Sequence, residues 1–360
     1  MSKPELPHPL FAAQAEALAS RFSNSAAARD LAGGTPKAER ELLRDSGLLN
    51  ISVPVELGGG GASWRQTLET VRILARADSS LAHVYAFHHL LLATTRLFGS
   101  DGQWRDWQAQ SVAQRQFWGN ALNPLDRRTV ATRAPGGYLF DGQKSFCSGA
   151  LDSDRLLLSA LEEGSERLLI AVVPTDRAGI ELFGDWNNMG QRQTDSGSAR
   201  FDRVAVHDAE LLLDPGPLSS PYACLRPLLA QLILASIYLG IAEGALAQAG
   251  DYTRSQARAW HFSAASEARR DPYTLRHYGE FWLAIEAAAT AKLAADRAGL
   301  DITSRIFEVM GARATHARLR LDRFWRNVRT HTLHDPADYK LAELGNWALN
   351  REYPQPSFYS

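Results

Sequence analysis

Two histidines near the C-terminal end of the chain, His331 and His334, stand three residues apart in a run of arginines that ends at Pro336. Residues three apart on a helix lie on one face, so both imidazoles can reach a single site. A proline cannot continue a helix, which places the pair at a helix end where ligands have access. The alternative is a solvated basic helix end, because His and Arg also suit helix C-termini. Spacing alone leaves both interpretations open.

Charge and cysteine content exclude several classes of protein. The chain has 360 residues and a formal net charge of -1, which gives no electrostatic footprint for nucleic acid. Its two cysteines, Cys147 and Cys224, can form neither a disulfide framework nor a multi-cysteine zinc site. The proline-rich N-terminus lacks the apolar core of a secretory signal, and polar residues interrupt the apolar stretch 228–249, which favours a buried helix over a membrane span. We therefore expect a cytoplasmic protein with no metal site, nucleic-acid partner or membrane segment.

The first third of the chain shows helical periodicity. Apolar residues recur at steps of three and four from Leu10 onward, and Ser63 is placed to cap a helix over 64–77. Another apolar helix is expected over 81–98. We expect an N-terminal helical domain over residues 1–116.

Short β-like runs separated by turns follow. Gly136-Gly137 divides runs 129–133 and 138–141, which indicates a hairpin, and runs 156–161 and 168–173 flank a further turn. We expect a central antiparallel β domain over residues 117–215.

Helical patterns return over residues 221–360. Predicted helices cover 227–256, a segment beginning after Asp271-Pro272, 300–310 and 315–330. An antiparallel four-helix bundle needs a turn between Glu286 and Gly299, yet the sequence there has no turn signal. Either the bundle is truncated at this point or a loop near 289–290 is missing from the sequence, and we expect the missing loop. The fold class is α+β: helical domain, β domain, helical bundle.

Six segments carry a resemblance to a known family. In chain order they are Trp118–Ala121, Lys144–Ala150, Gln191–Ser198, Arg258–Trp260, Gly311–Thr315 and Arg329–Pro336. Together they resemble the acyl-CoA dehydrogenase superfamily, and specifically its flavin-dependent monooxygenase branch, which includes dibenzothiophene monooxygenase and sulfur-acquisition enzymes. The resemblance implies a two-component enzyme: a separate flavin reductase supplies reduced FMN, oxygen forms a C4a-hydroperoxyflavin, and a small organosulfur substrate is oxygenated.

The resemblance also implies roles for individual residues. It assigns the catalytic site to Asn120, Ser148, His331, His334 and His88, with His88 facing the substrate, and leaves His83 and His89 structural. It assigns cofactor binding to Trp118, Asn120, Ser148, Trp186, Arg258, Arg313 and His334. The two arginines suit the flavin phosphate because a guanidinium binds phosphate with two parallel hydrogen bonds. Because Arg313 is expected to come from a partner subunit, the resemblance implies a homodimer or homotetramer.

Two alternatives remain open at this point. An FAD-dependent acyl-CoA dehydrogenase would need a carboxylate base, and Asp335 stands near the position where such enzymes carry a glutamate. A scaffold that kept the fold without the chemistry would bind flavin without turnover. No GxGxxG fingerprint follows a predicted strand, which argues against a nicotinamide site within the chain.

Overall fold

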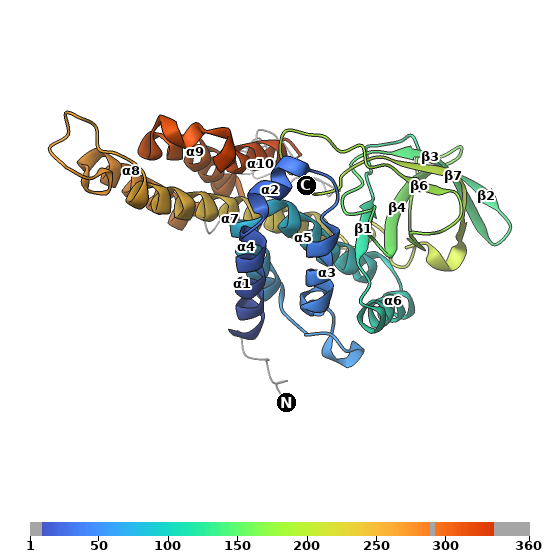
Figure 1. Cartoon of the computed structure of the whole chain (residues 1–360). Helices are drawn as coiled ribbons and strands as arrows, with labels where there is room; N and C mark the ends of the chain where they lie inside the picture. The colour runs from blue at the N-terminus through green and yellow to red at the C-terminus, as the bar shows by residue number, and fades with distance from the viewer. Residues whose placement is uncertain (1–8, 289–291, 335–360) are drawn as a thin grey trace, which may run out of the picture.

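The computed structural model describes residues 9–288 and 292–334, and it joins two helical regions to a sheet (Figure 1). The first region contains α1 (Pro9–Ser23), α2 (Ala26–Ala32), α3 (Lys37–Asp45), η1 (Leu48–Asn50), η2 (Val55–Leu57), α4 (Trp64–Ala77), α5 (Ser79–Phe98) and α6 (Asp101–Gln114). Its helix starts follow local chemistry: Ser63 forms a capping box with Gln66 at α4, and the Asp78 carboxylate accepts from the first backbone N–H groups of α5. Nearly all of α5 is buried, which makes it the central helix of the molecule.

The sheet contains seven strands and is not purely antiparallel. They are β1 (Trp118–Ala121), β2 (Val130–Ala134), β3 (Gly137–Lys144), β4 (Arg155–Glu162), β5 (Leu168–Pro174), β6 (Ile180–Leu182) and β7 (Ala199–His207), followed by η3 (Asp208–Glu210). The predicted hairpin is confirmed as β2–β3, and β4–β5 also pair antiparallel. However, β1 and β2 both run parallel to β4, so the purely antiparallel prediction was wrong. These parallel pairs join strands that are distant in sequence, and local turn signals carry no information about them.

The second helical region contains α7 (Leu225–Ser255), η4 (Ala268–Arg270), α8 (Pro272–Ala288), α9 (Lys292–Met310), η5 (Ala312–Thr315), η6 (Ala317–Leu319) and α10 (Arg323–Thr332). Arg305 of α9 contacts Glu280 of α8, and Glu308 contacts His277, so these two helices run antiparallel. The predicted missing loop near 289–290 falls within 289–291, outside the described residues. The single helix expected over 315–330 is instead η6 followed by α10, with Arg320 in the left-handed region (φ 49°) between them.

Helix α7 is the one described helix that is long and apolar enough to cross a membrane. More than half of its most apolar stretch is buried inside the protein, and it packs against α4, α5 and α9. Close approach to α4 requires glycine: a Cβ at Gly240 would lie 2.5 Å from the Arg72 carbonyl oxygen, and one at Gly244 would lie 2.1 Å from that of Arg76. These contacts identify α7 as a core helix of the bundle.

Buried apolar clusters connect the three regions. One cluster joins α1, α4 and α5 with α7, α9 and α10, so the two helical regions share a core. A second lies between the sheet and helices α5 and α6, including Phe98, Trp107 and Leu157. In Figure 1 the sheet occupies one end of the molecule and α8 with α9 projects from the other. Helix α5 therefore lies where the sheet and the bundle meet.

Candidate active site

A cavity of about 680 Å³ opens where α5, the sheet and the end of α10 come together. Its volume falls within the range of about 300–1,000 Å³ that is typical of ligand pockets. The residues that line it come from α5, the end of β1, two loops of the β region and α10: His83, Phe87, Asn120, Leu122, Asn123, Leu125, Phe146, Ser148, Trp186, Asn188, Met189, Gln191, Thr194, Ser196, Thr330, His331, Leu333 and His334. The wall combines aromatic and aliphatic side chains with amides, hydroxyls and imidazoles.

Five of the predicted site residues meet at this cavity. Asn120, Ser148, Trp186, His331 and His334 all line it, although they are spread over more than two hundred residues of sequence. The histidine spacing predicted one face at a helix end, and α10 ends at Thr332, between the two histidines. The structure thus brings the C-terminal motif together with three motifs from the β region.

His88 does not face the cavity, and that prediction was wrong. Its side chain is fully buried, its Nε2 lies 2.9 Å from the carbonyl oxygen of Leu49, and its Nδ1 accepts from the backbone N–H of Trp118 at 3.2 Å. Burial lowers the pKa of His88 to about 4. Both ring nitrogens are occupied by backbone groups, so His88 joins α5 to η1 and β1.

His83, for which the resemblance implies a structural role, lines the cavity. Five residues on a helix correspond to a rotation of about 140°, so His83 and His88 lie on different faces of α5. The ring of Phe87, one turn further along, stacks on the His83 ring with centroids 4.2 Å apart. The i, i+4 spacing of His83 and Phe87 is the sequence signal that could have identified this face.

Trp118 and the two arginines also lie away from the cavity wall. Trp118 is buried between the sheet and the helices, where its indole N–H donates to Ser111 at 2.8 Å. Arg258 and Arg313 are exposed, and Arg313 lines a separate open hollow of about 490 Å³ together with Arg318. Within one subunit, the described structure therefore does not bring these three residues to the predicted site.

A continuous chain of hydrogen bonds runs through the cavity wall. His331 Nε2 lies 2.9 Å from His83 Nδ1, and His83 Nε2 lies 3.1 Å from the Ser148 hydroxyl. The Ser148 hydroxyl lies 2.7 Å from that of Ser196, which lies 2.7 Å from that of Thr194. Thr194 in turn donates to the backbone carbonyl of Gln191 at 3.0 Å. The resemblance includes the Gln191–Ser198 segment but does not single out Thr194 or Ser196. Their connection to Ser148 depends on tertiary structure, because Ser148 and Ser196 lie on different loops.

Burial keeps His83 and His331, the two histidines of the hydrogen-bond chain, neutral. It lowers the pKa of His83 to about 3, with a smaller contribution from the nearby His334. It also lowers the pKa of His331 well below its usual value, with further contributions from His83 and His334. Near neutral pH each ring therefore carries one proton and offers one donor and one acceptor.

The loops that carry Ser148 and Gln191 adopt uncommon backbone conformations. Phe146, Gln191 and Asp195 have φ values of 63°, 52° and 54°, in the left-handed region that non-glycine residues rarely occupy. Such strain is maintained where the surroundings determine the geometry. The fully buried Arg40 donates to the carbonyl oxygens of Gly149 and Asp152, and its Nη1 lies 3.6 Å from the Asp195 carboxylate. These contacts fix both loops against α3.

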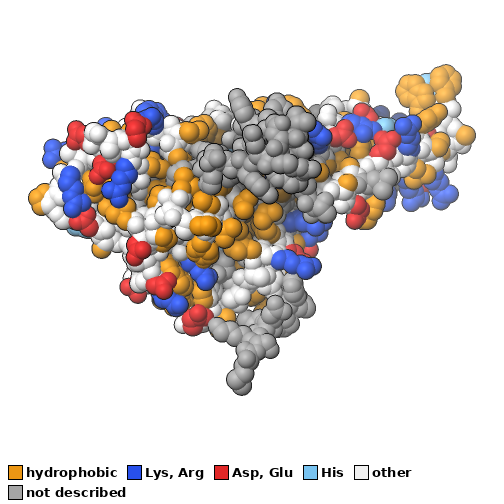
Figure 2. All heavy atoms as spheres, turned by 180° about the vertical axis from the view of Figure 1, so that it is seen from behind, with side chains coloured by type: hydrophobic (Ala, Val, Ile, Leu, Met, Phe, Trp, Pro, Cys, Tyr) orange, Lys and Arg blue, Asp and Glu red, His pale blue; other side chains and the backbone are white. Residues whose placement is uncertain are grey.

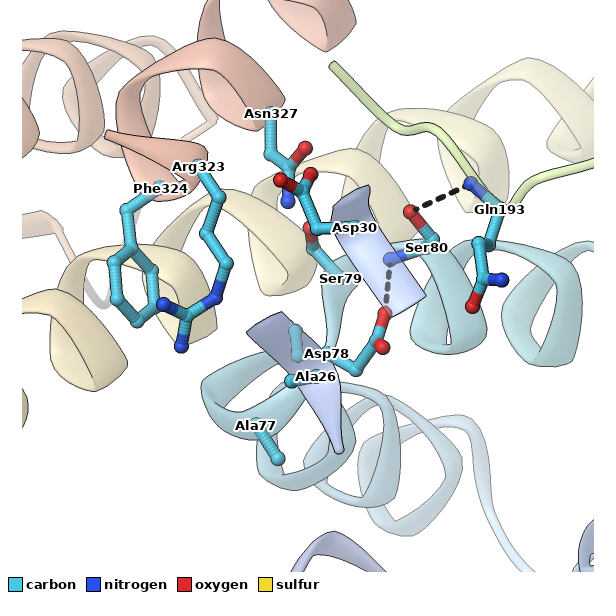
Figure 3. A pocket seen from close by; sticks show the side chains of 11 residues that line it. Ala26, Asp30, Ala77, Asp78, Ser79, Ser80, Gln193, Arg323, Phe324 and Asn327 are labelled. Atoms are coloured by element: carbon cyan, nitrogen blue, oxygen red, sulfur yellow. Dashed lines mark hydrogen bonds between the residues drawn. The ribbon is translucent and has the colours of Figure 1, made fainter. Parts of the chain in front are cut away.

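Helix α10 is anchored on its far side around a second, much smaller cavity of about 20 Å³ (Figure 3). In that view Arg323, Phe324 and Asn327 of α10 face Asp30 of α2 and the first residues of α5. The Asp30 carboxylate lies 2.5 Å from Arg320 and 2.6 Å from Arg326.

The same helix also holds the loop that carries Gln191. The side-chain oxygen of Asn327 accepts from the backbone N–H of Gln191 at 2.7 Å. At Gly190 a Cβ would lie 2.1 Å from the carbonyl oxygen of Arg326, so only glycine allows this approach. The position of α10 therefore determines both the histidine pair and the loop opposite Ser148.

The cavity suits the ring system of a flavin. Phe146 and Trp186 meet edge to face at 6.1 Å between ring centroids, which provides an apolar wall for a flat aromatic group. Three of the lining residues also have a buried side-chain atom with no hydrogen-bond partner among the described residues, at Gln191 Oε1, Thr330 Oγ1 and His331 Nδ1. Buried polar atoms are normally paired, so the hydrogen bonding of this wall is incomplete within the described part of the chain. The cavity lining contains no Lys or Arg among the described residues, so a flavin phosphate needs cations from elsewhere.

Comparison with known proteins agrees with this arrangement. Residues 8–114 match the model of the acyl-CoA dehydrogenase N-terminal domain, and residues 286–339 match that of the acyl-CoA dehydrogenase C-terminal domain. The chain is 54% identical to a Pseudomonas putida protein named "Probable FMNH2-dependent monooxygenase SfnC", with 98% of each chain covered.

Two solved structures are similarly close. Methanesulfinate monooxygenase MsuC from Pseudomonas fluorescens is 56% identical, with a TM-score of 0.95, and covers 99% of this chain and 100% of its own. The FMN-bound form of TdsC from Paenibacillus sp. A11-2, a dibenzothiophene monooxygenase, is 40% identical, with a TM-score of 0.93, and covers 97% of this chain and 100% of its own. The predicted resemblance and fold class are confirmed: this chain belongs to the acyl-CoA dehydrogenase family and, within it, to the FMNH2-dependent monooxygenases.

Proposed function

We propose that this enzyme oxygenates a small organosulfur compound, with reduced FMN supplied by a separate flavin reductase. The observation that carries the proposal is the cavity itself, in which aromatic side chains and unpaired polar atoms surround the Ser148–His83–His331 chain. The named relatives act on methanesulfinate and dibenzothiophene, which are both sulfur compounds. The FAD-dependent dehydrogenase alternative has less support, and its base, Asp335, lies outside the described residues.

The residues around the cavity have distinct proposed tasks. When bound, reduced FMN supplies the activation of molecular oxygen. Asn120, Ser148 and His334 bind its reactive edge, and Phe146 with Trp186 flanks its rings and excludes water. The side-chain oxygen of Asn120 already accepts from the backbone N–H of Leu122 at 3.2 Å, which directs its amide N–H groups toward the cavity. Preorganised donors of this kind stabilise charge that develops on a reacting oxygen.

The phosphate is proposed to be held by Arg258 and Arg313 across a subunit interface. Two observations support an oligomer: the cavity has no cation in its described lining, and the tip beside Arg258 exposes large aromatic side chains. Trp260 is 69% exposed and Phe262 is 82% exposed, and hydrophobic side chains gather at the projecting tip in Figure 2. Clusters of exposed large apolar side chains mark protein contacts. This arrangement corresponds to a homodimer or homotetramer. We further propose a cytoplasmic location and domains over 1–116, 117–215 and 221–360.

Stopped-flow mixing tests the function directly. Anaerobic protein with chemically reduced FMN is mixed with oxygen, and absorbance is followed through the near-ultraviolet and blue. A transient band that outlasts the reoxidation of free flavin, and that decays faster with a small sulfinate or sulfide, supports the proposal. Direct reoxidation without a transient contradicts it, and dye reduction by an acyl-CoA would then favour the dehydrogenase.

A further inference from the structure

The hydrogen-bond chain in the cavity wall has a single possible order of protons. It contains five contacts: Gln191 carbonyl to Thr194, Thr194 to Ser196, Ser196 to Ser148, Ser148 to His83, and His83 to His331. Each contact needs one proton, and the Gln191 carbonyl at one end of the hydrogen-bond chain can only accept. Thr194 must therefore donate to Gln191, Ser196 to Thr194, and Ser148 to Ser196.

The two histidines must supply the remaining protons. Because the three hydroxyl protons are used, the contact between Ser148 and His83 requires a proton on His83 Nε2. A neutral His83 then has a bare Nδ1, so the last contact requires a proton on His331 Nε2. A neutral His331 consequently has a bare Nδ1, and this is the atom that is buried without a partner among the described residues.

The order of protons determines what Ser148 presents to a ligand. Its hydroxyl accepts from His83 and donates to Ser196, which leaves only a lone pair for the cavity that it lines. The carbonyl that fixes the order is itself held in place, because it also accepts from the indole N–H of Trp186 at 2.7 Å.

We propose that Thr194 and Ser196 are positioning residues that make Ser148 a hydrogen-bond acceptor, and that this selects reduced over oxidised FMN. The inference rests on the proposed function. Reduction converts a bare nitrogen of the central flavin ring into an N–H group. An acceptor stabilises such a donor, whereas it faces a bare nitrogen with no proton to share.

The test measures the affinities of reduced and oxidised FMN by anaerobic titration of the full-length protein. In Ser196→Ala the Ser148 proton loses its acceptor and is free to turn toward the cavity. The affinity for reduced FMN divided by the affinity for oxidised FMN, the affinity ratio, should therefore fall by about 3- to 10-fold. Thr194→Val has nearly the same shape, and it should lower the ratio through the same chain. Ser196→Thr and Thr194→Ser retain the hydroxyls and should restore the ratio. Ser198→Ala is the matched control, because that hydroxyl binds Asp185 at the surface and lies outside the chain.

The second readout needs no flavin. Nitrogen-15 NMR of the apo protein, with signals assigned from His83→Asn and His331→Asn, should show both histidines protonated on Nε2. A proton on Nδ1 of either ring overturns the proton order, and an unchanged affinity ratio in Ser196→Ala and Thr194→Val overturns the selection of reduced FMN. Wild-type protein that binds neither form of FMN would instead overturn the proposed function, and the inference with it.

Discussion

His334 differs from the other two cavity histidines in its exposure to solvent. His83 and His331 are buried and held in the hydrogen-bond chain, whereas His334 lies beyond the end of α10 at the cavity mouth. An exposed imidazole can exchange protons with water, which the two buried rings cannot do directly. The proposed role of His334 as a donor to the reacting oxygen follows from this position.

Replacing His334 with alanine should separate oxygen consumption from product formation. We expect binding of reduced FMN to change little, and the product formed per oxygen consumed to fall about tenfold, because a positioned donor is lost. Oxygen electrode traces with product quantification measure this ratio. His207→Ala, at the end of β7 and far from the cavity lining, is the control. Full coupling in His334→Ala would show that the assigned role is wrong.

His83 and His88 should respond to substitution in opposite ways. His88→Leu leaves the Leu49 carbonyl and the Trp118 amide buried and unpaired, which should cost about 2–4 kcal/mol in the free energy of unfolding. His83→Asn removes a cavity group, and should lower the rate of product formation by roughly 10- to 100-fold with a smaller loss of stability. Urea unfolding and steady-state kinetics of both variants provide the comparison. The reverse pattern would restore His88 as the functional histidine.

At the scale of elements, local chemistry predicted the beginnings of helices well. The Ser63 cap of α4 and the Asp271-Pro272 start of α8 were both correct, since capping depends on residues within one turn. The cavity face of α5 was missed, because this helix is buried nearly all round and the i, i+4 spacing of His83 and Phe87 was the one local signal for it. The parallel pairing of β1 with β4 and the contact between Ser148 and Ser196 also join distant segments. Five of the predicted site residues therefore lie at one cavity, whereas the positions of His83, Thr194 and Ser196 required the structure.

Helix α10 should depend on Asp30 for its position. Asp30→Asn removes a largely buried carboxylate that pairs with Arg320 and Arg326, which should lower the free energy of unfolding by about 2–4 kcal/mol. Because α10 carries His331 and supports Gln191, turnover should also fall in protein that remains folded. The control is Asp322→Asn, whose carboxylate is about half exposed and lies 2.8 Å from the same Arg326. Equal effects of the two substitutions would contradict an anchoring role for Asp30.

The buried histidines of α5 predict how stability depends on pH. An unfolded histidine has a pKa of about 6.5, whereas that of folded His83 is about 3. As pH falls below 6.5 the unfolded state binds a proton that the folded state excludes. Stability is therefore present above that pH and is lost as pH falls toward 3, by up to about 1.4 kcal/mol per pH unit for each such histidine.

The variant His83→Asn isolates this contribution. Between pH 6.5 and 5 its free energy of unfolding should decline less steeply than that of the wild type. The difference between the two slopes should correspond to about one bound proton. Urea titrations at several pH values measure both slopes. Burial raises the pKa of Asp195 to about 6, which acts in the opposite direction, but this contribution is common to both proteins and cancels in the difference. Parallel slopes would show that His83 is not held neutral by the fold.

At the scale of the whole molecule, the arrangement of cations fits the proposed partner subunit. The cavity is lined by neutral groups, whereas Arg258 and Arg313 lie exposed outside its lining, Arg258 in the loop after α7 and Arg313 in η5. A phosphate-bearing cofactor bound in the cavity therefore finds no Lys or Arg in the described lining. Association of two copies by symmetry can supply it, because each subunit then contributes cations to the site of the other.

Arg313→Ala tests this shared site. Loss of a charge-assisted hydrogen bond should weaken reduced FMN roughly 10- to 100-fold while sedimentation shows an unchanged oligomer, and Arg167→Ala on the β4–β5 turn should have no effect. Co-expression of Arg313→Ala with His334→Ala subunits then distinguishes a shared site from a closed one. If the arginine comes from the partner, random pairing in a dimer makes about a quarter of the sites intact and raises product formation above that of either variant alone. If each subunit completes its own site, every site keeps one defect, so product formation by the mixture stays between the levels of the two variants.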